Sequence, residues 1–226
     1  SGPTVMTFIS KWLSKKRKRN FTYRIIFIPE TIGSISYIKL NKKILQKNIF
    51  AGFNISCVGD NREYSFLPSR NENTFSDFLL KFVLKKKDKN FIKYSWSDRG
   101  SDERQYCSPG VDLPIASFCR SKYGTYSEYH TSLDNLKNVV SKDGLEGSFR
   151  VIQKLILLIE NSKFPKVKNL CEPKLSDKGL YPWLSKKNNY SKKTKLIVDL
   201  ISYSDGTKSI MQIANKLQVS QKKIEF

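Results

Sequence analysis

The sequence predicts an α/β fold, a three-layer sandwich in which helices cover both faces of a mixed, mostly parallel sheet. Helix-like and strand-like segments alternate along roughly the first 160 residues, and several of the strand-like segments are near-continuous apolar runs. Strands that are buried on both faces are typical of sheets covered by helices on either side. A chain of 226 residues is also long enough to bury one good core.

The elements follow one another in a regular order. Apolar residues recur at helical spacing in three early segments, which predicts helices at 4–13, 31–45 and 75–85. Segments rich in β-branched and aromatic residues predict strands at 21–28, 49–58, 91–96 and 113–119. A longer helical pattern covers 135–159, with an expected break at 142–147.

The end of the chain has a different composition. Residues 161–189 are rich in Lys, Pro and Asn and are expected to form a linker. An amphipathic helical pattern at 193–204, a turn at Asp205–Thr207 and a second helix at 210–217 follow. This order resembles the start of a winged-helix unit. The sequence therefore predicts an α/β domain over 1–160 and a partial winged-helix segment over 190–226.

The net charge of +21 invites a nucleic-acid interpretation, because clustered Lys and Arg neutralise phosphates. However, Lys outnumbers Arg by more than three to one, and Arg is the preferred residue for bidentate phosphate and base contacts. The basic clusters, such as Lys15–Arg19, also lie at element boundaries or loops. Nucleic-acid binding is therefore the least favoured function.

Several sequence features indicate the cellular location of the protein and the state of its cysteines. No apolar run reaches the ~18 residues that a membrane span needs, and no secretion signal is recognisable, so we expect a cytoplasmic protein without a membrane partner. The four cysteines have no paired spacing, which argues against a zinc knuckle or a disulfide framework.

Three polar residues, of types that commonly bind metal ions, lie near the ends of expected elements. Glu30 follows the first expected strand, Asp60 ends the second, and His130, the only histidine, lies in a polar, turn-rich segment. Functional groups of α/β sheets collect where strands end. A paired-metal hydrolase needs carboxylate and imidazole ligands and one free carboxylate to take a proton from water. These residues supply part of such a site.

Structural roles for the same residues remain open alternatives. Glu30 can interact with a helix dipole, and Asp60 can serve as a turn residue. His130 can be a structural imidazole bonded to Asp134 or Thr131.

Four segments together resemble the co-catalytic zinc aminopeptidases, particularly the aminopeptidase-like proteins of bacterial surface-polysaccharide gene clusters. They are Phe27–Ser34, Gly52–Asp60, Gly100–Gly110 and Tyr129–Asp134. The last two are the most specific, because of their order and spacing. The C-terminal segment also resembles that family's winged-helix appendage. The resemblance implies a zinc exopeptidase-like fold that binds one or two zinc ions.

The resemblance also implies roles for individual residues. Glu30 stands at the position of the general base, and Asp60 and His130 stand at the positions of metal ligands. Thr31 occupies the position of a second glutamate, normally a metal ligand, so this sequence departs from the family's pattern there.

Other residues match positions around the metal site. Asp102 matches a residue that shapes the active-site wall, and Glu103 replaces the histidine that follows it. Asp134 is expected close to the His130 loop. Arg104 and Tyr129 are candidates for the substrate pocket.

The resemblance places a further histidine and a bridging aspartate ahead of a segment like Ser1–Thr4. The chain is therefore expected to be a C-terminal portion with an incomplete metal site, inactive by itself. The leading hypothesis is a zinc-dependent aminopeptidase-like hydrolase of a peptide or amide substrate, with a homo-oligomer left open. The alternative is a non-catalytic binding or scaffold protein that retains the peptidase fold and serves surface polysaccharide biosynthesis.

Overall fold

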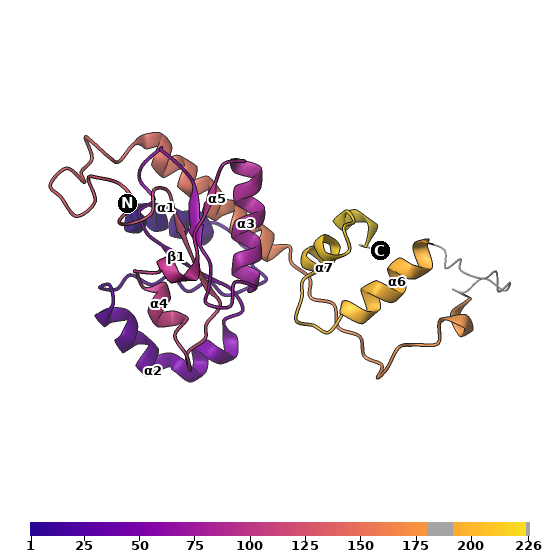
Figure 1. Ribbon diagram of the computed structural model, residues 1–226. Coiled ribbons are helices and arrows are strands. Elements are labelled where there is room, and N and C mark those ends of the chain that lie inside the picture. The colour runs from indigo at the N-terminus through magenta and orange to yellow at the C-terminus, as the bar shows by residue number, and fades with distance from the viewer. Residues whose placement is uncertain (180–191, 225–226) are drawn as a thin grey trace. The chain divides into compact units, whose positions relative to one another are not determined.

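The computed structural model describes residues 1–179 and 192–224 (Figure 1). The chain divides into two compact units, Ser1–Glu160 and Asn161–Phe226. The helices of the first unit are α1 (Gly2–Ser14), α2 (Ile32–Asn48), α3 (Phe75–Lys87), α4 (Glu103–Tyr106) and α5 (Lys142–Glu160). Its strands are β1 (Gly52–Ile55), β2 (Ser65–Leu67), β3 (Ile92–Lys93) and β4 (Ile115–Cys119).

In the described part of the chain, these strands form a four-stranded sheet in the order β1-β4-β2-β3. β1 is parallel to β4, β2 is antiparallel to β4, and β3 is parallel to β2. All five residues of β4 are buried, as expected of a central strand covered on both faces. The predicted fold class, a mixed and mostly parallel sheet between helices, is confirmed.

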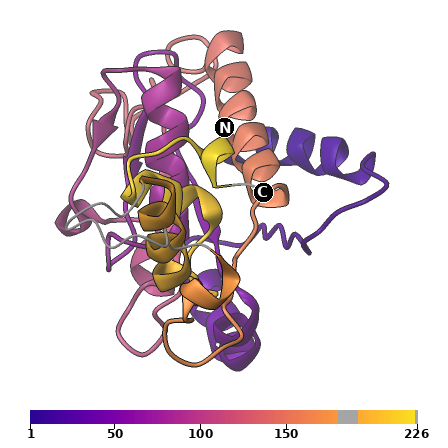
Figure 2. The same cartoon turned by 90° about the vertical axis from the view of Figure 1, so that its right-hand side faces the viewer.

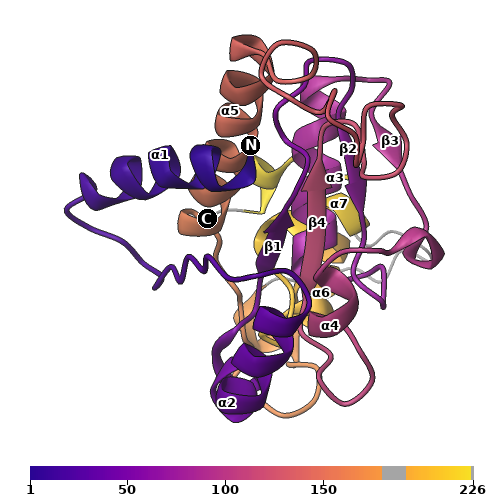
Figure 3. The same ribbon diagram turned by 90° about the vertical axis from the view of Figure 1, so that its left-hand side faces the viewer.

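Helices cover the sheet on both faces (Figure 3). On one face α3 packs against β4 and α5, and α1 crosses α5 (Figure 2). On the other face α4 packs against β4 and α2. Successive β4 side chains alternate between these layers: the Ser117 hydroxyl donates to Glu103 at the start of α4. The start of α3 is set locally by a capping box between Thr74 and Asp77.

The strand predicted at 21–28 is wrong. These residues follow α1 without forming a strand, and no backbone hydrogen bond joins them to another described segment. The segment has the composition of a strand, but a strand requires a paired neighbour. None of the described strands lies against it.

Other boundaries also differ from the predictions. The helix expected from 135 begins at Lys142, inside the expected break, and residues 136–139 form a turn. The segment of the expected break lies within α5, where Gly144 approaches the backbone of Gly59 and Asp60. The strand expected at 91–96 is reduced to β3, since a 3₁₀ turn begins at Trp96.

The second unit contains α6 (Lys192–Tyr203) and α7 (Ile210–Lys216). A capping box between Ser209 and Gln212 starts α7. Lys166, in the segment expected as a linker, forms an antiparallel bridge with Asp205. Its hydrophobic cluster consists of the buried residues Ile213, Ala214 and Ile224, packed against Leu200, Tyr203, Ile210, Leu217 and Val219. Residues 180–191, part of the expected linker and winged-helix segment, lie outside the described residues. No helix in 1–179 or 192–224 is long and apolar enough to cross a membrane.

Candidate functional site

Glu30 lies on a sharp turn that leads into α2. Its carboxylate is exposed and makes no hydrogen bond within residues 1–179 and 192–224. The next residue, Thr31, has φ 63°, an uncommon conformation for a residue other than glycine. The Thr31 N–H donates to Asp102 Oδ1 at 2.8 Å, and Arg104 Nη2 donates to Thr31 Oγ1 at 3.1 Å. Two predicted site residues, Asp102 and Arg104, thus hold the turn that presents Glu30.

Asp60 lies in the loop after β1 and is 3% exposed. Oδ1 accepts hydrogen bonds from the Arg62 N–H and the Ser121 hydroxyl, each at 3.0 Å. Oδ2 accepts the Ser121 N–H, also at 3.0 Å. The carboxylate joins the end of β1 to the residues after β4. This geometry gives Asp60 a structural role whether or not it also binds a metal.

We expect Asp60→Ala to lower the free energy of unfolding by about 2–3 kcal/mol, because the buried Ser121 groups lose their acceptor. Urea denaturation in the presence of EDTA measures this cost without any contribution from metal. The control is Glu30→Ala, which removes a carboxylate that is exposed and unbonded among the described residues. Equal stabilities of the two variants would contradict the structural role of Asp60.

His130 lies on an exposed loop with φ 59°. Its ring stacks on Tyr129, with 3.9 Å between centroids. In the part of the chain that the structure describes, no hydrogen bond joins its imidazole to another group, and neither the Asp134 nor the Thr131 side chain is a partner. Asp134 instead accepts the Tyr126 hydroxyl at 2.9 Å. Both imidazole nitrogens are therefore available to a ligand.

Tyr129, beside His130, has several acidic neighbours. Burial raises the pKa of the Tyr129 hydroxyl, and the neighbouring groups Cys57, Glu30 and Asp134 raise it further. A tyrosinate is disfavoured by nearby negative charge.

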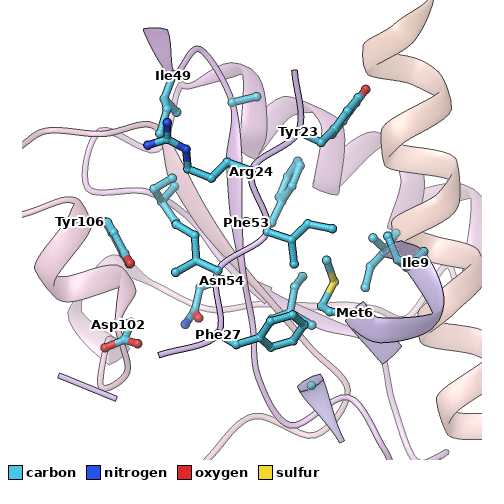
Figure 4. Close-up of a pocket in the computed structure, with 18 of the residues that line it drawn as sticks. Met6, Ile9, Tyr23, Arg24, Phe27, Ile49, Phe53, Asn54, Asp102 and Tyr106 are labelled. Atoms are coloured by element: carbon cyan, nitrogen blue, oxygen red, sulfur yellow. The ribbon is translucent and has the colours of Figure 1, made fainter. Parts of the chain in front are cut away.

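Four of the predicted site residues line two cavities beside β1, whereas His130, Arg104 and Tyr129 line neither. Glu30 and Asp102 border a cavity of about 610 Å³, and Figure 4 shows Asp102 with other lining residues. Asp60 and Asp134 border a second cavity of about 580 Å³, together with Cys57. Residues of β1 contribute to the walls of both.

These side chains do not gather into a metal site by themselves. A zinc site takes three or four protein donors. Among the described residues, no three His, Cys, Asp or Glu side chains lie close enough together to hold an ion. Both Asp60 oxygens already accept hydrogen bonds, and His130 stands apart on its loop. The residues present do not fit zinc without further donors.

The sequence analysis assigned no role to Glu103, which the structure shows to be a buried carboxylate. Its side chain is 0% exposed, and no cation pairs with it among the described residues. Its oxygens accept hydrogen bonds of 2.7–3.0 Å from the N–H groups of Gly100 and Ser101 and the side chains of Asn54, Ser117 and Tyr123. The only sequence signal was a carboxylate where the resembling family has a histidine.

The pKa of Glu103 reflects two opposed effects. Burial by itself raises the pKa of the carboxyl, but hydrogen bonds from Tyr123, from the backbone of Gly100 and Ser101 and from Ser117 outweigh burial and lower it. Glu103 therefore stays ionised and fixes α4, which carries Arg104 and follows Asp102.

Residues 1–162 match the family described as "Domain of unknown function (DUF4910)". The chain belongs to this family. Residues 163–226 match a winged helix-turn-helix family. The DUF4910 match covers every predicted site residue and the whole first unit.

A Clostridium acetobutylicum protein, whose name refers to polysaccharide biosynthesis and an aminopeptidase-like domain, is 35% identical over 227 residues, covering 100% of this chain and 51% of that protein. A crystal structure of a candidate peptidase from the same organism matches with TM-score 0.72 and 34% identity, over 97% of this chain and 48% of its own. This DUF4910 chain therefore spans about half the length of the relatives it matches, and it has an aminopeptidase-like relative, as the sequence predicted.

Proposed function

We propose that this chain forms part of a zinc-dependent, aminopeptidase-like hydrolase that cleaves a peptide or amide bond. The relative's name and the TM-score of 0.72 to a candidate peptidase support a peptidase-like function. The observation that carries the proposal is the free carboxylate of Glu30, held by a fixed turn at the border of a cavity.

Glu30 is suited to accept a proton. A general base must reach the proton that it takes, in a defined orientation. The hydrogen bonds from Thr31 to Asp102 and from Arg104 to Thr31 set the orientation of the turn. The adjoining cavity is lined largely by apolar residues, which suits a ligand with apolar groups.

Zinc binding is proposed only for a protein that has the full length of the matched relatives, called here the relative-length protein. In such a protein Asp60 and His130 would hold the ion together with donors from the remaining half, and the ion would supply a Lewis acid. Equilibrium dialysis with zinc tests this point. We expect stoichiometric binding by the relative-length protein and weaker binding by residues 1–226 alone. Equally weak binding by both proteins would reject zinc dependence.

In the relative-length protein, Glu30→Gln is expected to lower kcat on an aminoacyl-p-nitroanilide by about 10²–10⁴-fold, as loss of a general base does. Unfolding midpoints should stay the same, because the Glu30 side chain is exposed. The control is Glu146→Gln, an exposed carboxylate on α5 that pairs with Arg150. Unchanged kcat in Glu30→Gln would remove Glu30 from the catalytic step.

A non-catalytic binding protein is the second candidate function. It is favoured by the internal use of the Asp60 carboxylate and by the absence of a three-donor group in the described residues. This alternative predicts that the relative-length protein binds peptides yet neither binds zinc nor hydrolyses them.

A further inference from the structure

A long cleft separates residues 21–28 from β1. The two segments start side by side, since the ring of Phe21 lies 4.9 Å from that of Phe50, just before β1. They also end at the same cavity, where Glu30 and Ser56 both contribute to its wall. Figure 4 shows Tyr23 and Phe27 following the same direction as Ile49 and Asn54. The cleft thus lies between two segments that run in the same direction.

Backbone groups on both sides of the cleft lack partners. The N–H groups of Gly52 and Ser56 donate to carbonyls of Pro114 and Phe118, at 3.2 and 3.3 Å. Because these groups alternate along a strand, the N–H and C=O groups of Phe53 point away from β4, toward the cleft. Residues 21–28 make no backbone hydrogen bond to any described residue. Two unpaired edges therefore face each other.

The cleft is closed above and below by apolar side chains. One layer contributes Met6, Ile9 and Leu13 from α1 and Ile152, Ile156 and Ile159 from α5. The opposite layer contributes Tyr37, Leu45 and Tyr106. Unpaired peptide groups along the edges and apolar walls on both faces are the environment of a strand buried in a sheet.

We propose that this cleft receives an extended β-strand that pairs with both β1 and residues 21–28. The occupant is a strand from the half of a relative-length protein that this chain does not match. One added strand takes ~4.7–4.9 Å on each side, and strand addition satisfies backbone groups while side-chain pockets give specificity. The pairing would make 21–28 the strand that its composition predicts.

Two observations favour this occupant over a second copy of the chain. The chain matches only 51% of its relative, so a large partner segment exists in that protein. The net charge of +21 opposes close association of two identical copies. The proposal does not depend on hydrolytic activity, because strand pairing is a matter of structure and binding.

The test is co-expression of the 226-residue chain with the unmatched half of the Clostridium acetobutylicum relative. We expect a 1:1 complex in size-exclusion chromatography with light scattering. Hydrogen–deuterium exchange should then slow at the amides of Phe53 and Ile55 and throughout 21–28. A complex without this protection would place the partner elsewhere and overturn the proposal. The absence of a complex would also overturn it.

A matched pair of variants locates the contact. Phe27 lines the cleft and is 55% exposed, so Phe27→Lys places a charge in the cleft with little effect on folding of the free chain. Leu40, 83% exposed on α2 and outside the cleft, gives the control Leu40→Lys. We expect Phe27→Lys to weaken the complex about tenfold or more and Leu40→Lys to leave it unchanged. Equal effects would contradict the proposed surface.

A backbone variant gives an independent check. Ile55→Pro removes an N–H that faces the cleft, at a position where an edge strand tolerates proline. Circular dichroism verifies the fold of the free chain, and the complex should be weakened. A self-dimer of the wild-type chain that Phe27→Lys dissociates would show that a second copy fills the cleft, and would reject the proposed occupant.

Discussion

Replacing Glu103 by alanine is expected to lower the free energy of unfolding by about 3–5 kcal/mol. The carboxylate is fully buried and accepts hydrogen bonds from side chains of β1 and β4, from backbone N–H groups of the loop before α4, and from Tyr123. Alanine leaves those donors buried without an acceptor. Urea denaturation at pH 7 measures the change, and Glu146→Ala on the exposed face of α5 is the control.

The pH dependence gives a second measure of the same effect. Because folding lowers the pKa of Glu103 from its ordinary value of 4.5, its contribution to stability is present above that value. The contribution is lost as pH falls through the lower pKa of the folded state. The stability difference between wild type and Glu103→Gln should therefore narrow in acid. A difference that grows below pH 4 would show that the folded-state pKa is not lowered.

Gly144→Ala is expected to destabilise the protein by about 2–4 kcal/mol. Helix propensity alone predicts the opposite sign, a gain of about 1 kcal/mol. The steric effect of the tertiary environment outweighs helix propensity, because a Cβ on Gly144 would overlap the backbone carbonyl oxygens of Gly59 and Asp60. Backbone atoms held on both sides have little room to move. Thermal denaturation of the variant measures the outcome.

The control for this substitution is Lys154→Ala, at an exposed position of α5, which should change stability by less than about 0.5 kcal/mol. The substitution at Gly144 should also displace Asp60, whose turn it packs against. Changed NMR shifts at Ser121, which donates to Asp60, would detect the displacement. A Gly144→Ala variant more stable than wild type would show that the start of α5 can shift to accept the Cβ without losing stability, which would contradict this prediction.

Much of the fold was predictable because its signals are local. Apolar periodicity placed α2 and α3 within a few residues of their observed bounds, and the buried apolar run at 113–119 became β4. Residues 21–28 had an equally clear strand pattern, yet a strand depends on a partner that is distant in sequence. β4 has both strand propensity and neighbouring strands to pair with. Residues 21–28 have the propensity but no pairing strand among the described residues.

The candidate site was predictable only in part. Sequence reasoning selected Glu30, Asp102 and Arg104, and the structure joins all three around the Thr31 turn. The hydrogen bonds that occupy Asp60, and the burial of Glu103, depend on contacts between segments about 60 and 50 residues apart. No local pattern encodes such contacts.

By itself, the sequence determined the α/β class, most of the helices and strands, and the polar residues near their ends. Periodicity and composition act over short stretches and suffice for these. The tertiary structure alone decided that Asp60 is held by Ser121, that His130 stands free of Asp134, and that a cleft with two unpaired edges lies beside β1. Those outcomes depend on which segments meet across the sheet, because packing and pairing act between residues far apart along the chain.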